Sequence, residues 1–188
     1  MKNYILGILF LFDCVGFNAQ AQSPVSFFEE HIDFTLDNRY FSINGIYSFH
    51  NSADKTVNQS IIFPFTDKTT TIDSIRIINL NTSRKIKFDR LDSSVSFSFM
   101  LQPKDTVDIN IFYRQKVTGT NKYIITSTQS WGKPLEKAIY TLTTAKDLKI
   151  KSFSYVPDSS KKINDKMLYS WRKEHFMPQV EFEVTIKE

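Results

Sequence analysis

Hydrophobic and polar residues alternate with a period of two along most of the chain, which is typical of half-buried β-strands. Short polar turns separate the alternating runs, and strands repeating every 8–12 residues or so favour a sandwich or a barrel. We therefore predict an all-β, antiparallel β-sandwich with a single domain. The predicted strands cover residues 31–36, 41–49, 57–65, 75–77, 85–89, 94–101, 107–114, 123–128, 135–143, 148–156 and 180–186.

The clearest pattern lies in two runs, 94–101 and 107–114, which we predict to form an antiparallel hairpin around the turn at 102–105. The final strand alternates equally well and places Val180 on its inward face. The side chains predicted to be buried are those of Phe97, Phe99, Ile109, Ile111, Phe182 and Val184. The side chains predicted to be more exposed are those of Ser96, Ser98, Asn110, Glu181 and Glu183.

One region, 159–176, fits two interpretations. It forms either a loop followed by a strand, which we favour, or a short helix with Ile163, Met167 and Trp171 on one side. In the helical alternative, the polar residues 158–160 would cap its start.

The first 21 residues have the features of a cleavable export signal. Lys2 supplies a positive end, residues 4–12 are apolar but too short to span a bilayer, and Ala19-Gln20-Ala21 forms a small-x-small cleavage site. We expect a mature chain of residues 22–188 that is periplasmic or secreted. The alternatives are an N-terminal strand, a membrane anchor, or lipidation at Cys14, where Asp13 occupies the position that a lipoprotein motif reserves for a small residue.

Composition narrows the range of partners. Aromatic residues make up 14% of the chain and charged residues 23%, which excludes a disordered tail. The net charge of +4 comes from lysines spread over the C-terminal half, without the dense arginine run that phosphate recognition favours. We therefore expect no nucleic-acid partner and interpret the lysines as a solvated face, with an anionic envelope surface as the alternative. No segment after the signal is long and apolar enough for a membrane span.

The sequence contains no recognisable catalytic or metal-binding motif. The three histidines, His31, His50 and His175, are not spaced like zinc ligands, and neither a nucleophile elbow nor a phosphate-binding loop is present. Glu181 and Glu183 stand two residues apart on one strand face, about 7 Å from each other, which is within the range of an inverting glycosidase pair. The same spacing also marks the solvent face of an amphipathic strand, which is the interpretation we favour. We expect no metal and no cofactor.

Aromatic residues in polar surroundings give the strongest binding signal. Trp131 lies in the polar stretch 127–134, and Trp171 follows Tyr169. Such rings either stack on a sugar or a peptide side chain or plug the end of a sandwich core, and the second role is the more common. The predicted ligand-binding residues are Trp131, Lys133, Tyr169 and Trp171, with a carbohydrate or an envelope protein as the partner.

Several short segments carry a family resemblance. The stretch 123–138, YIITSTQSWGKPLEKA, together with 47–51, YSFHN, and 62–65, IFPF, resembles segments of uncharacterised exported β-domains of bacteria. More distantly, the layout over residues 30–186 is similar to the noncatalytic N-terminal β-domain of aminopeptidase-N-type metallopeptidases. The resemblance implies a stand-alone periplasmic β-sandwich. The His-Glu-x-x-His zinc motif of those peptidases is absent from this sequence, so no peptidase activity is implied.

Two further segments, Asp73-Ser74-Ile75 and Asp105-Thr106-Val107, look like the Asp-Ser/Thr-apolar acceptor for O-glycosylation of exported bacterial proteins. Ser74 and Thr106 are the candidate acceptors. Ordinary turn residues that open a strand would give the same pattern.

We conclude that the sequence favours a non-catalytic, exported binding or accessory module of the bacterial cell envelope. A small secreted hydrolase whose site is assembled only by tertiary folding is the first alternative. A structural subunit that pairs through an open strand edge is the second.

Overall fold

The computed structural model describes residues 23–68 and 71–187, and the predicted signal segment with Cys14 lies outside them. The described chain is nearly all β, as predicted, with one short 3-10 helix, η1 (Thr126–Trp131). Within these residues no helix has the length and hydropathy needed to cross a bilayer. The strands are β1 (Val25–Leu36), β2 (Tyr40–Asn51), β3 (Val57–Pro64), β4 (Asp73–Asn79), β5 (Arg84–Lys85), β6 (Asp89–Arg90), β7 (Ser94–Leu101), β8 (Thr106–Lys116), β9 (Thr120–Tyr123), β10 (Leu135–Thr144), β11 (Ile150–Phe153), β12 (Ser159–Ile163), β13 (Lys166–Phe176) and β14 (Phe182–Ile186).

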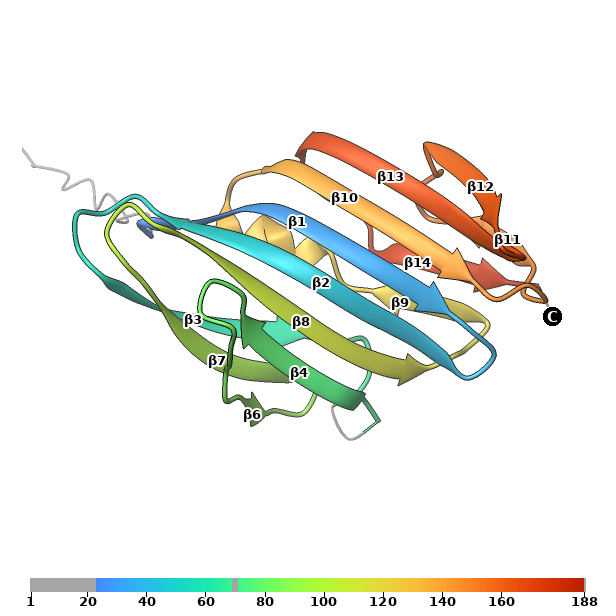
Figure 1. Cartoon of the computed structure of the whole chain (residues 1–188), viewed down its shortest axis with the longest axis horizontal. Helices are drawn as coiled ribbons and strands as arrows, with labels where there is room; N and C mark the ends of the chain where they lie inside the picture. The colour runs from blue at the N-terminus through green and yellow to red at the C-terminus, as the bar shows by residue number, and fades with distance from the viewer. Residues whose placement is uncertain (1–22, 69–70, 188) are drawn as a thin grey trace, which may run out of the picture.

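Eight strands form one large sheet in the order β12-β13-β10-β1-β2-β8-β4-β5 (Figure 1). The sheet is mixed, because β1 and β10 run parallel while its other pairs are antiparallel. The expectation of purely antiparallel pairing is therefore wrong. Alternation of side chains reports which face of a strand is buried and carries no information on the direction of its neighbour.

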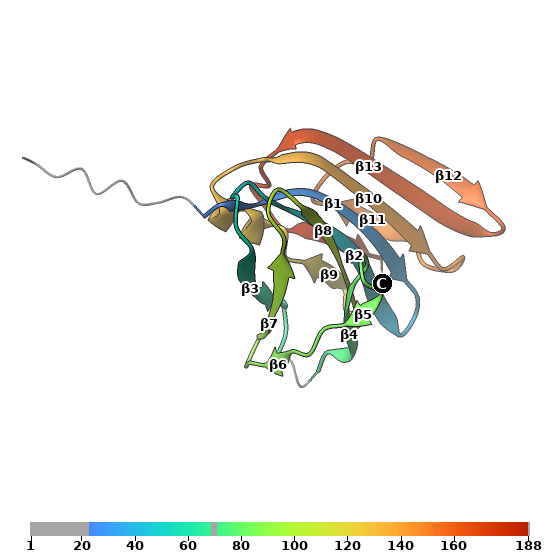
Figure 2. The same ribbon diagram turned by 60° about the vertical axis from the view of Figure 1, so that its left-hand side comes forward.

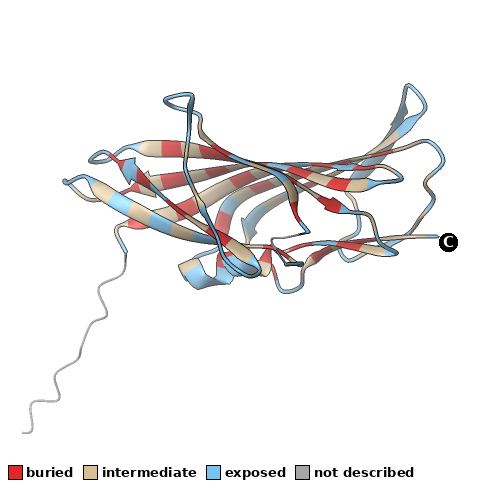
Figure 3. Ribbon diagram, turned by 90° about the horizontal axis from the view of Figure 1, so that it is seen from below, coloured by how far each residue is buried: buried red, intermediate tan, exposed pale blue. Residues whose placement is uncertain are grey.

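Two three-stranded sheets, β3-β7-β6 and β11-β14-β9, cover one face of the large sheet (Figures 1 and 2). Ring contacts join the layers: Phe34 of β1 stacks on Phe182 of β14 with centroids 4.4 Å apart, and Phe49 of β2 lies 5.1 Å from Phe99 of β7. Buried and less buried positions alternate along the strands (Figure 3). The core thus lies between the large sheet and the two small ones.

The burial predictions hold with one exception among the core strands. Phe97, Phe99, Ile109, Ile111, Phe182 and Val184 are all buried. Asn110, predicted to be exposed, is buried because Ile46 and Ile78 flank it on the outer face of the sheet and its amide donates to Asn44 Oδ1 and to the Gly45 carbonyl, each at 2.9 Å.

The predicted hairpin of residues 94–114 is wrong. β7 pairs with β3 and β6 in a small sheet, whereas β8 pairs with β2 and β4 in the large one, so the turn at 102–105 crosses between layers. Buried Asn51 holds this corner, since its side-chain amide donates to the carbonyls of Lys55 and Gln102 at 2.9 Å. In both strands the predicted faces are buried, but the two strands belong to different sheets.

Several strand boundaries also differ from expectation. The chain leaves the sheet after Tyr123 and forms η1 instead of continuing as a strand to 128. β14 begins at Phe182, and Val180, predicted to face inward, is 52% exposed. Residues 159–176 form the hairpin β12–β13, so the strand interpretation is correct for the second half of this region and the helical one is wrong.

Candidate functional site

A β-bulge in β1 determines which side chains enter the interior near its start. The pairing with β2 shifts by one residue between Phe27 and Glu29, so that Phe28 is the additional residue. Phe27 faces the core before the bulge, and Glu30, Ile32 and Phe34 face it afterwards. The bulge therefore turns a carboxyl group inward, and Glu30 is only 2% exposed.

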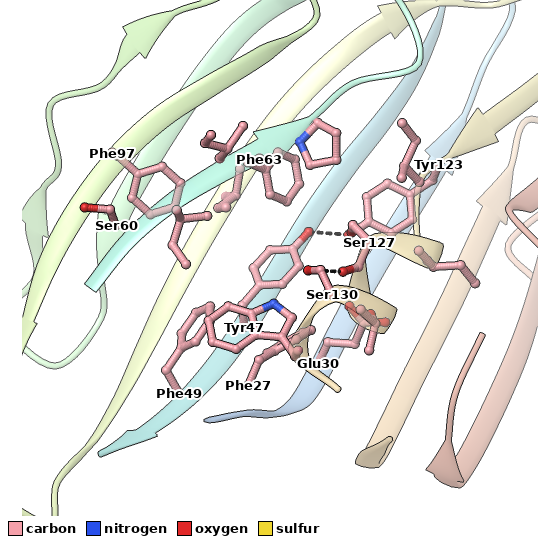
Figure 4. Close-up of a pocket in the computed structure, with 18 residues that line it drawn as sticks. Phe27, Glu30, Tyr47, Phe49, Ser60, Phe63, Phe97, Tyr123, Ser127 and Ser130 are labelled. Carbon is pink, nitrogen blue, oxygen red and sulfur yellow. Dashed lines mark hydrogen bonds between the residues drawn. The ribbon is translucent and has the colours of Figure 1, made fainter. Parts of the chain in front are cut away.

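Glu30 lies at the floor of a cavity of about 330 Å³ (Figure 4). The large sheet supplies the floor through side chains of β1, β2 and β8. One wall is β3, from Ser60 to Pro64, and the other consists of residues 123–131, which end β9 and form η1. The cavity thus opens where the facing edges of the two small sheets leave the large sheet uncovered. Most of its lining is aromatic or aliphatic.

Three tyrosines supply the polar groups next to the carboxyl. Tyr140 of β10 donates its hydroxyl proton to Glu30 Oε1. Tyr47 of β2 and Tyr123 of β9 share a hydrogen bond of 2.6 Å between their hydroxyls, across the two layers (Figure 4). Among the described residues no cation pairs with Glu30, and its second oxygen, Oε2, has no hydrogen-bond partner.

Burial is the largest cause of the pKa shifts in this cluster. Removal from water raises the pKa of Glu30 from 4.5 to about 7, although the Tyr140 hydroxyl opposes the shift by bonding to the carboxylate. Burial also raises the pKa of Tyr47, Tyr123 and Tyr140, and the nearby Glu30 charge raises each further. Glu30 is consequently half ionised near neutral pH, whereas the tyrosines stay neutral.

Trp131 stands at the rim of this cavity, at the end of η1. Its ring is half-buried and lies 5.5 Å from Phe49 and 6.0 Å from Phe27, measured between centroids. Gly132 ends the helix with a φ of 69°, a left-handed conformation that favours glycine. Trp131 therefore combines the two roles that its sequence context left open, because it packs against the core and also lines an open cavity.

The other predicted binding residues lie elsewhere. Lys133 is exposed in the turn after η1 and does not line the cavity. Tyr169 and Trp171 come together on β13, where both rings pack against Phe153 at 4.9 and 5.4 Å. Trp171 is 1% exposed and its indole N–H donates to the Tyr155 carbonyl at 2.9 Å, so it forms part of the core. The structure thus separates Trp131 from the Tyr169–Trp171 pair.

Glu181, which directly precedes β14, and Glu183 within it both have structural partners. The Glu181 carboxylate accepts hydrogen bonds from the backbone N–H groups of Ile125 and Thr126 and from the Thr126 hydroxyl, at the start of η1. Glu183 forms an ion pair with Lys122 at 2.7 Å. Glu181 is half-buried, which makes it more exposed than the adjacent Phe182 as predicted, and it supplies the missing partners of these N–H groups. Among the described residues no group of three or more metal-ligating side chains converges.

The candidate glycosylation residues both lie at strand starts. Ser74 follows the first residue of β4, is exposed, and has a φ of 57°. Its hydroxyl donates to Asp73 Oδ1 at 2.9 Å. Thr106 begins β8, and its hydroxyl lies 3.3 Å from His50 Nδ1.

Sequence reasoning missed Glu30, although a signal was present. Glu30 falls on the same phase as Ile32, Phe34 and Leu36, all of which are predicted to face inward. A carboxyl group at an inward position is seldom fully buried without a partner, and such groups are often functional. The pattern therefore contained the clue, but Tyr140 and Tyr123 are more than ninety residues distant in sequence and only the fold brings them to Glu30.

The arrangement is similar to known structures at the level of the fold. A candidate nutrient binding protein of Legionella pneumophila superposes with a TM-score of 0.66 at 14% identity, over 88% of this chain and 67% of that one. An M1 zinc metallopeptidase of Deinococcus radiodurans superposes with a TM-score of 0.53 at 8% identity, over 87% of this chain and 42% of the peptidase. The expected resemblance to the β-domain of such peptidases is thereby confirmed for the fold. No known protein family and no curated protein matches the sequence.

Chemically, the cavity offers apolar walls, paired tyrosine hydroxyls and one buried carboxyl with a free oxygen. Concave, largely apolar sites with a few placed polar groups are typical of small-ligand binding.

Proposed function

We propose that the chain is a non-catalytic, exported β-sandwich module of the bacterial cell envelope that binds the apolar part of a ligand in the cavity beside Trp131. The observation that carries this proposal is the cavity itself, with aromatic walls and Glu30 at its floor. The fold-level likeness to a candidate nutrient binding protein agrees with a binding role.

The volume and the walls set what the cavity accepts. About 330 Å³ is at the lower end of the range for small-molecule sites, so one aromatic ring with a short chain fits. Such a group would replace water against Phe27, Phe49 and Trp131, which gains roughly 25 cal/mol for each Å² of apolar surface buried. Trp131 closes the rim and is the residue that a bound group would touch from outside.

Single-tryptophan variants test this proposal. The chain contains two tryptophans, so Trp171→Phe leaves Trp131 as the sole indole and Trp131→Phe leaves Trp171. Titration with the neutral one-ring compound 2-(4-bromophenyl)ethanol, whose bromine quenches an indole only at contact, should lower the tryptophan emission of the Trp171→Phe protein, with saturation at one ligand per chain.

The Trp131→Phe protein is the matched control. Its remaining indole, Trp171, is buried among Phe153 and Phe182, so its emission should stay constant during the same titration. Equal responses in both proteins, or none in either while the protein remains folded, would refute binding at this cavity.

Pairing through a strand edge is the second candidate. β12 is the outer strand of the large sheet and all its residues are exposed. Lys161 and Lys162 project from it, and charged residues on an edge oppose pairing with another chain. Sedimentation that is independent of concentration would agree with the binding module and exclude the edge-paired subunit.

A further inference from the structure

We infer that the cavity recognises a protonated primary amine attached to an apolar body, with Glu30 as the anion that receives the ammonium group. This inference rests on the proposed function, because it assigns a ligand class to the same cavity.

The Glu30 carboxyl is only partly hydrogen-bonded by the described residues. One carboxyl oxygen accepts the Tyr140 hydroxyl proton, and the other has no hydrogen bond among the described residues, although the side chain lines the cavity. A buried carboxyl is normally paired with a cation or fully hydrogen-bonded. Here the missing partner would have to come from the cavity, and an ammonium group supplies both the charge and the N–H donors.

The walls of the cavity favour a cationic ligand over an anionic one. In the part of the chain that the structure describes, no lysine, arginine or histidine lines the cavity, so no basic side chain there favours an anionic ligand. The aromatic rings of Phe27, Tyr47 and Trp131 line the cavity. The π-face of such a ring attracts a cation and repels an anion. Both features select the same sign of charge in the ligand.

Ionisation of Glu30 makes the affinity for an ammonium group depend on pH. The titratable groups that face Glu30 are Tyr47 from β2, Tyr123 from β9 and Tyr140 from β10, and burial raises the pKa of each, so they remain neutral. Glu30, with a pKa of about 7, is the group among them that changes charge near neutral pH. An ammonium group prefers the ionised carboxylate, so its binding should strengthen as the pH rises through 7.

A pair of small ligands of equal size tests the inference. Binding of 2-phenylethylamine and of 2-phenylethanol is measured by calorimetry at pH 8 and at pH 6. The amine should bind at least about tenfold more tightly than the alcohol at pH 8, as expected for a desolvated charge-assisted contact. Its affinity should fall about tenfold at pH 6, because the ionised fraction of Glu30 falls by that factor. The affinity for the alcohol should stay within about twofold across the same range.

Glu30→Gln and Glu29→Gln form a matched pair of variants. Glu29 is the neighbouring residue, pairs with Lys137 at 2.7 Å and does not line the cavity. Glu30→Gln should abolish the preference for the amine and its pH dependence while the alcohol still binds, and Glu29→Gln should leave both unchanged.

The outcomes separate the inference from the proposed function. If the alcohol binds as tightly as the amine at pH 8, the amine inference is wrong and the binding module stands. If neither ligand binds, both fail. If Glu30→Gln does not fold, the comparison of the two ligands at the two pH values in the unaltered protein decides the question.

Discussion

Glu30 of β1 lies directly opposite Tyr47 of β2 in the antiparallel pair, and both side chains line the same cavity. The β-bulge after Phe27 creates this relationship, because it moves Glu30 from the outer phase of the strand to the inner one. The neighbouring tyrosine pair, Tyr47 and Tyr123, then ties the large sheet to the small one at the edge of the cavity.

Glu30 should make the stability of the protein depend on pH in an unusual direction. The pKa of Glu30 is about 7 in the folded state, whereas the ordinary value for a glutamate, taken for the unfolded state, is 4.5. Between these two pH values the folded state holds a proton that the unfolded state releases. The free energy of unfolding should therefore fall as the pH rises from 5 to 8, by up to about 3 kcal/mol. Urea unfolding at several pH values measures this change.

Two variants test whether Glu30 causes this pH dependence of the free energy of unfolding. Glu30→Gln should remove it, whereas Glu29→Gln should retain it. The lowered pKa values of Asp73, Asp147 and Asp158 affect stability only in more acidic solution, outside this window. An unchanged slope in Glu30→Gln would show that this carboxyl is not the group responsible.

The tyrosine pair should behave as a coupled unit. Tyr47→Phe or Tyr123→Phe alone leaves one buried hydroxyl without its partner, at a cost of about 1–3 kcal/mol in the free energy of unfolding. The double variant should cost less than the sum, with a coupling of about 1 kcal/mol. Combining Tyr47→Phe with Tyr169→Phe, whose ring lies in another cluster, should give additive losses.

Core packing predicts a large contrast between neighbouring residues of β7. Phe99 is 5% exposed and contacts Phe49, so Phe99→Ala should lower the free energy of unfolding by about 3–5 kcal/mol. Met100, the next residue, is 54% exposed, and Met100→Ala should change it by less than about 0.5 kcal/mol. Similar losses for both in denaturant titrations would mean that the face of β7 is assigned incorrectly.

Export remains a prediction with its own measurement. Mass spectrometry of the protein expressed with its leader in a Gram-negative host should give a chain that begins at Gln22 without lipid. A chain that begins at a lipid-modified Cys14 would contradict both the predicted cleavage site and the prediction of a periplasmic or secreted chain without a lipid anchor.

The sequence predicted the faces of the strands much better than their partners. Alternation is a local property, so Phe97, Ile109 and Phe182 could be placed inside from their neighbours alone. The choice between layers for β7 and β8, and the parallel pairing of β1 with β10, depend on contacts between distant segments that no local pattern records.

The candidate site, too, could be predicted from the sequence only in its local features. Trp131 could be singled out because a large ring stands in a polar stretch, and Glu30 could have been noticed at an inward position. The bulge that lets Phe27 and Glu30 both face the interior, and the three tyrosines that surround Glu30 from β2, β9 and β10, arise only when the layers assemble.

Crystallography with a heavy-atom ligand tests the binding cavity most directly. Crystals of the mature chain soaked in 2-(4-bromophenyl)ethanol, a neutral compound, should give an anomalous bromine peak between Phe49, Phe63 and Trp131. This peak is expected whether or not the cavity prefers amines, because the alcohol carries no charge. Ordered bromine found only outside the cavity, with the cavity walls unchanged, would contradict the account.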